Sequence, residues 1–83
     1  PAPAMLAAAG RVERWQPADH ALSYTLATPE AVQAVARLSL PAQPKTVTIA
    51  GQPTSDAQWD AASKTLLVRH AGNPKGVEVT IAW

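Results

Sequence analysis

The 83-residue sequence contains no cysteine and no phenylalanine. Without cysteine the chain forms no disulfide and offers no thiolate for catalysis, a composition that fits both the cytosol and the bacterial periplasm. No run of about 18 apolar residues exists, so we expect no transmembrane segment. The apolar stretch at residues 4–9 is short and follows no basic segment, so it does not qualify as a signal peptide.

An excess of charge of either sign is also absent. Seven basic and six acidic side chains give a formal net charge of +1, and they are scattered along the chain. Proteins that bind nucleic acid usually carry a basic stripe that displaces counterions from the phosphates. We therefore predict no nucleic-acid partner.

Motifs that carry chemistry are missing as well. His20 and His70 are far apart in sequence and have no cysteine or second histidine close by, whereas zinc sites usually contain closely spaced pairs. No serine has the G-x-S-x-G context of a nucleophile, and the four glycines are isolated, so no phosphate-binding loop is expected. The carboxylates fit turn and surface positions better than a catalytic pair. We predict that this chain alone is not an enzyme and binds no metal or cofactor.

The apolar residues that are present make a thin core. They form 47% of the chain, but alanine supplies nearly half of them. Such a core gives a marginally stable domain, so we expect it to pack against a neighbouring domain. Pro1 in place of an initiator methionine predicts a cut or processed start.

After Gly10 the apolar residues alternate with a period of about two, which is typical of half-buried strands. The different parity of Val12 and Trp15 indicates a bulge in a first hairpin, whose turn we place at residues 17–19. Residues 28–33 predict a loop or helical turn before a strand over 34–40. Clear alternation continues in the segments 22–26, 46–50, 65–70 and 77–83.

This pattern predicts an all-β fold, a small antiparallel β-sandwich of six to seven strands with an immunoglobulin-like arrangement. Two sheets must share one core, because a single sheet would leave its apolar face in water. The sandwich is expected over residues 11–83. Residues 1–10 are rich in proline and alanine and show no alternation, so they are interpreted as a linker or interdomain connector.

The aromatic residues support two interpretations. Sugar rings stack on exposed indole and phenol faces, so Trp15, Tyr24 and Trp59 on one sheet would form a carbohydrate-binding platform. In a chain without phenylalanine, the same side chains are also needed to fill the core. Trp15 and Tyr24 are expected to be cross-strand neighbours, and Trp83 is expected in the core or at an interdomain interface.

Several segments resemble the C-terminal β-sandwich of multidomain bacterial glycoside hydrolases. In those domains a strand ends in Leu-Pro, the next reads Val-x-Val-x-Gly, a Trp/Tyr-Asp hairpin leads into Lys-Thr-Leu-x-Val, and a last alternating strand follows. The corresponding runs here are LSLP at 38–41, PKTVTIAG at 44–51, WDAASKTLLV at 59–68 and VEVTI at 77–81. Pro3 with AAAGRV at 7–12 is similar to the segment that leaves the (β/α)8 barrel in family five, including endoglycoceramidase-like members. Family thirty-one α-glucosidases end in similar sandwiches.

The resemblance implies a non-catalytic accessory domain that buttresses the catalytic (β/α)8 barrel of the same polypeptide and borders its substrate site. The catalytic carboxylates of such enzymes lie on the barrel, so no catalytic residue is carried over to this chain. Carbohydrate or glycolipid would be the ligand, and a periplasmic or secreted location is favoured over a cytoplasmic one. The alternatives are a true carbohydrate-binding module and an immunoglobulin-like spacer of a bacterial surface protein.

Overall fold

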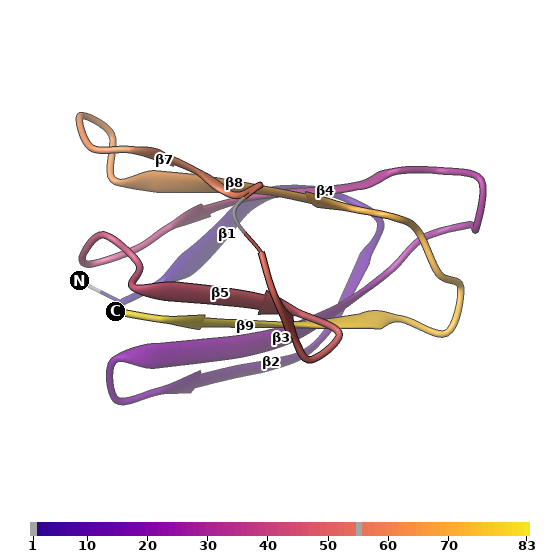
Figure 1. Ribbon diagram of the computed structural model, residues 1–83, viewed down its shortest axis with the longest axis horizontal. Coiled ribbons are helices and arrows are strands. Elements are labelled where there is room, and N and C mark those ends of the chain that lie inside the picture. Colours follow the sequence, from indigo (N-terminus) through magenta and orange to yellow (C-terminus); the bar gives the residue numbers. More distant parts are fainter. Residues whose placement is uncertain (1, 55) are drawn as a thin grey trace.

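A computed structural model, which describes residues 2–54 and 56–83, contains two antiparallel sheets packed face to face (Figure 1). Sheet A has the strand order β1-β4-β8-β7, and sheet B has the order β2-β3-β9-β5-β6. The strands are β1 (Ala4–Ala9), β2 (Arg11–Ala18), β3 (Ala21–Ala27), β4 (Ala34–Ser39), β5 (Thr46–Ile49), β6 (Gln52–Pro53), β7 (Gln58–Asp60), β8 (Thr65–His70) and β9 (Val77–Ala82). The predicted all-β sandwich is confirmed, with nine strands in place of six or seven. Within the described ranges no helix could cross a membrane.

The core lies between the two sheets and follows the alternation of the sequence. In Figure 1, β4, β8 and β7 form the upper layer, and β5, β9, β3 and β2 form the lower one. Each layer turns every second side chain inward, because successive residues of a strand point to opposite faces. The largest fully buried side chains are Leu22, Tyr24, Leu26, Leu38, Leu66, Val68, Val79 and Ile81.

Strand β1 is a correction to the sequence analysis. Residues 4–9, interpreted as part of a connector, pair antiparallel with β4, with Ala4 opposite Ser39 and Ala9 opposite Val35. Alanines give almost no contrast between an inward and an outward face, so the strand leaves no alternating pattern in the sequence. Its place in the sheet comes from backbone hydrogen bonds, which do not depend on the side chains.

Gly10 lets the chain pass from sheet A to sheet B. Its φ of 137° lies where side chains are rarely tolerated. A Cβ at this position would collide with Thr28 Cγ2 and lie 2.8 Å from the carbonyl oxygen of Ala27. The two edge strands β1 and β2 are therefore joined by one residue that has to be glycine.

The first hairpin forms as predicted, except for its turn. The β2–β3 register shifts between Glu13 and Gln16, which confirms the bulge, and Arg14 has a φ of 54° there. The turn lies at residues 19–20 with His20 at a φ of 58°, two residues later than predicted, and residues 17 and 18 belong to β2. Proline has no N–H to donate to a neighbouring strand, so Pro17 is tolerated here because β2 is an edge strand.

The ambiguous segment after β3 is also resolved. Residues 28–33 form turns and bends without a helix, and β4 begins at Ala34, as the sequence analysis favoured. Ala34, Ala36 and Leu38 face the core and are almost fully buried. The alternation of the sequence thus marks the start of β4, and Thr28 and Pro29 lie in the loop that precedes it.

Candidate functional site

The three aromatic residues predicted to bind carbohydrate do not share one sheet. Trp15 lies in β2 and Tyr24 in β3, both in sheet B, whereas Trp59 lies in β7 of sheet A. A platform of three rings on one sheet face is therefore not formed. The structure brings together two of the three and leaves Trp59 apart from them.

Trp15 and Tyr24 are cross-strand neighbours, as expected, and their rings pack against each other. Tyr24 is only 1% exposed and belongs to the core, while the half-buried Trp15 packs against the same cluster. Tyr24 thus offers no ring face to a ligand. Its burial follows the second interpretation of the sequence, in which aromatic rings fill the core. Trp83, also half-buried, packs against this core.

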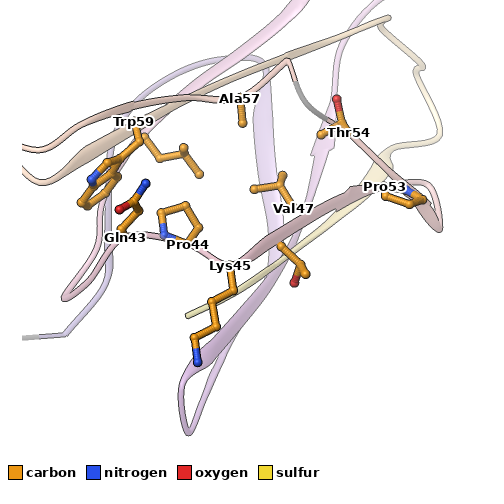
Figure 2. Close-up of a pocket in the computed structure, with 10 residues that line it drawn as sticks. Gln43, Pro44, Lys45, Val47, Pro53, Thr54, Ala57 and Trp59 are labelled. Atoms are coloured by element: carbon orange, nitrogen blue, oxygen red, sulfur yellow. The ribbon is translucent and has the colours of Figure 1, made fainter.

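Trp59 stands at the wall of a groove on the open side of the sandwich, where sheet A ends at β7 and sheet B ends at β5 and β6 (Figure 2). The groove has a volume of about 290 Å³. We call it the Trp59 groove. It is lined by Gln43, Pro44, Lys45, Thr46, Val47, Pro53, Thr54, Ala57, Trp59 and Leu66. Trp59 and Gln43 lie at one end of it, and Pro53 and Thr54 lie at the other.

Two backbone hydrogen bonds hold the sheet B side of the groove. The Lys45 amide donates to the carbonyl of Ala82 at 2.7 Å, which ties the segment before β5 to β9. The Thr54 amide donates to the carbonyl of Val47 at 2.9 Å, which fixes the chain after β6 against β5. Figure 2 shows the Val47 side chain turned into the groove and the Lys45 amine turned away from it. The floor is therefore apolar and its rim polar.

The β7–β8 hairpin places the indole of Trp59. Trp59 pairs with Leu66 across this hairpin, and the turn over residues 61–64 joins the two strands. Asp60 closes the turn by accepting hydrogen bonds from the Ala62 amide at 3.1 Å and from the Ser63 hydroxyl at 2.9 Å. The Ser63 bond, followed by that from Ala62, lowers the pKa of the Asp60 carboxyl below its ordinary value. Asp60 is thus ionised at neutral pH and shapes the turn beside Trp59.

Trp59 also lines a second hollow, on the outer face of sheet A. It has a volume of about 310 Å³ and is lined by Arg37, Gln58, Trp59, Asp60, Thr65 and Leu67. The guanidinium of Arg37, the amide of Gln58 and the carboxylate of Asp60 belong to this hollow. The amide of Gln43 and the hydroxyl of Thr54 lie on the side of the groove. Trp59 thus lines two recesses that both contain hydrogen-bonding side chains.

These groups suit recognition of a ligand with apolar ring faces and a hydroxyl periphery. An indole provides a flat apolar surface, while amides, guanidinium and carboxylate donate to or accept from hydroxyl groups. The described residues around the indole form no recognisable catalytic arrangement. Among residues 2–54 and 56–83, no three His, Asp or Glu side chains gather closely enough to hold a metal ion.

The sequence analysis named Trp59 as a candidate but did not predict the residues that line the recesses with it. Gln43, Thr54 and Arg37 come from three separate parts of the chain, and only the packing of the strands brings them into the two recesses that Trp59 also lines. The one local signal was the tripeptide of Gln58, Trp59 and Asp60, which puts a ring between two polar side chains. Long-range packing of this kind leaves no spacing motif.

Comparisons of this chain with protein-family models, with curated proteins and with solved structures found no match. A relationship to glycoside hydrolase domains is therefore a hypothesis that depends on the strand motifs of the sequence.

Proposed function

We propose that this chain is a non-catalytic accessory β-sandwich domain of a multidomain carbohydrate-active enzyme, and that its Trp59 groove contacts carbohydrate at the border of the substrate site. The observation that carries the proposal is that Trp59 lines two recesses, each of which contains hydrogen-bonding side chains. An aromatic ring flanked by a few polar groups is the usual chemistry of sugar recognition.

The strands of the fold are compatible with the resemblance. The Leu-Pro pair at 40–41 directly follows β4, the Val-x-Val-x-Gly-like run contains β5, and the Trp-Asp run forms the β7–β8 hairpin. In glycoside hydrolases of the kind that the sequence resembles, such a sandwich packs on the (β/α)8 barrel. A thin core, mostly of Val, Leu and Ala, also favours an arrangement in which a neighbouring domain adds stability.

The proposed contact is weak, since one indole and a few hydrogen bonds are involved. A dissociation constant near 1 mM corresponds to about 4 kcal/mol of binding free energy, which such a site can supply. Affinity of this order is sufficient to border a substrate that the catalytic domain already holds, because tethering raises the effective concentration.

Tryptophan fluorescence tests the proposal. The chain is titrated with neutral oligosaccharides, both α-linked and β-linked, and with the free oligosaccharide of a glycosphingolipid. We expect saturable quenching or a shift of the emission in wild type and in Trp15→Phe, and its loss in Trp59→Phe. An unchanged spectrum across the whole panel would contradict the carbohydrate contact.

A second assay addresses catalysis. The isolated chain is incubated with glycosides that carry a chromogenic leaving group. We expect no hydrolysis above that of a buffer control. Measurable turnover that survives repurification would show that the domain is catalytic and would overturn the proposal.

A further inference from the structure

The outer edge of β1 has no strand beside it among the described residues. β1 is the first strand of sheet A and pairs on one side with β4. Its other side presents backbone N–H and C=O groups that an extended chain can hydrogen-bond. Five of the six residues are exposed, and Leu6 at the register shift is 54% exposed.

The composition of this edge differs from that of the other three. Residues 4–9 contain no charge and no proline. The edge strand β2 carries Arg11, Glu13, Arg14 and Pro17, β6 has two residues and includes Pro53, and β7 has three residues and ends with Asp60. Charges, prolines and short length are the devices by which natural sheets prevent edge pairing. Apart from its bulge, β1 has none of them.

We propose that β1 pairs antiparallel with β1 of a second copy of this chain, which joins the two A sheets into one continuous sheet. The inference does not depend on the carbohydrate contact. Unpaired backbone groups on an extended edge select an extended strand as the occupant. A second β1 is suitable because an uncharged strand meets its own copy without placing like charges opposite each other.

The flanking charge selects the antiparallel direction. A parallel pair would place the two Arg11 side chains of the copies next to each other. In the antiparallel pair centred between Leu6 and Ala7, Arg11 lies near residue 2 of the other copy, about 30 Å from the second Arg11. The residues that then meet, Ala4 with Ala9 and Leu6 with Ala7, are small or apolar. A twofold axis makes the interface closed and self-complementary.

Sedimentation equilibrium tests the pairing. The interface is small, so we expect a dissociation constant of about 0.1 mM and a mass that rises from 8.7 kDa toward twice that value as concentration increases from about 10 µM to about 1 mM. A mass that stays at 8.7 kDa over the whole range overturns the proposal, since a strand from another protein would then be needed.

Two substitutions in β1 test whether this strand forms the dimer contact. Ala7 lies opposite Arg37, so the side chain in Ala7→Glu gains a cross-strand partner within the monomer. In the dimer it would lie opposite Leu6 of the second copy, with the two introduced carboxylates diagonal to each other beside the axis. We expect Ala7→Glu and Leu6→Lys to weaken dimerisation at least tenfold. Ala42→Glu, at an exposed loop position, is the matched control and should dimerise as wild type does.

Thermal melting followed by circular dichroism checks that each variant is folded at the temperature of the sedimentation run. Dimers that persist unchanged in both folded β1 variants, or that Ala42→Glu weakens equally, would overturn the assignment to β1.

Discussion

The indole of Trp15 packs against the phenol ring of Tyr24 across the first hairpin, with ring centroids 6.2 Å apart and planes inclined by 32°. The β2 bulge between Glu13 and Gln16 brings Trp15 to this position. On the sheet B side, Tyr24 belongs to the core and Trp15 packs against it, so the pair contributes two large aromatic side chains. Aromatic rings in this domain are therefore chiefly packing elements. Trp59 also packs against the core, and it lines two recesses as well.

The hydroxyl group of Tyr24 gives the first prediction. It is buried and has no hydrogen-bond partner among the residues that the structure describes. Because an unpaired buried polar group costs about 1–3 kcal/mol, Tyr24→Phe should leave the free energy of unfolding unchanged or raise it. Tyr24→Ala should lower it by about 3–5 kcal/mol by creating a cavity. Urea denaturation measures both values; a loss above about 1 kcal/mol in Tyr24→Phe would indicate a hydrogen bond to the hydroxyl.

The buried phenol of Tyr24 also leads to a prediction of how the free energy of unfolding changes at alkaline pH. Burial raises the pKa of Tyr24 well above its ordinary value. For a group whose folded pKa is raised, the stabilisation is fully present below the unfolded pKa of about 10 and is lost as pH rises above it. Wild type should thus lose stability between about pH 10 and 12 more steeply than Tyr24→Phe. Chemical denaturation across this range gives the two slopes, and parallel curves would contradict the prediction.

Replacement of Gly10 tests the passage between the sheets. Gly10→Ala adds a methyl group that collides with Thr28 and the Ala27 carbonyl at a φ that alanine rarely adopts. We expect a loss of about 2–4 kcal/mol of unfolding free energy. Gly51→Ala is the control, because it also has a positive φ but meets no atom within 4 Å, and should cost about 1 kcal/mol. Equal losses in the two variants would mean that close packing at Gly10 is unimportant.

The turn beside Trp59 gives a prediction that NMR can check. The Ser63 hydroxyl is the main cause of the lowered pKa of Asp60, so Ser63→Ala should raise this pKa toward the ordinary value. For a lowered carboxyl pKa, stabilisation is present above the unfolded pKa of about 3.9 and is lost as pH falls through the folded pKa. Carboxyl carbon shifts of Asp60 measure the titration. Ser23→Ala, in another sheet, should leave that titration unaltered.

Much of the fold could be predicted from the sequence, because strands with one buried face carry a visible period. Leu22, Tyr24 and Leu26 alternate, as do Val77, Val79 and Ile81, and these residues fall in paired central strands of sheet B. β1 could not be predicted in this way, since its alanines look alike on both faces. It is defined by the register with β4, which involves residues about thirty positions away.

The candidate site was predictable only in part. The sequence analysis named Trp59 together with Trp15 and Tyr24 as aromatic residues for sugar stacking, and it offered equal grounds for all three. Trp59 differs from Trp15 and Tyr24 in the sheet to which its strand belongs and in the position of that strand at the edge beside the groove. Those properties depend on strand order, and strand order depends on pairings between distant segments.

The most direct test of the carbohydrate contact is a two-dimensional NMR titration of the three indole N–H signals with oligosaccharides, assigned with single Trp→Phe variants. We expect the Trp59 signal to move saturably while the Trp15 and Trp83 signals stay in place, and backbone amides of Gln43, Thr54 or Arg37 to move with it. A titration in which Trp59 remains fixed at saturating sugar, or in which Trp15 alone responds, would contradict a carbohydrate contact at the Trp59 groove.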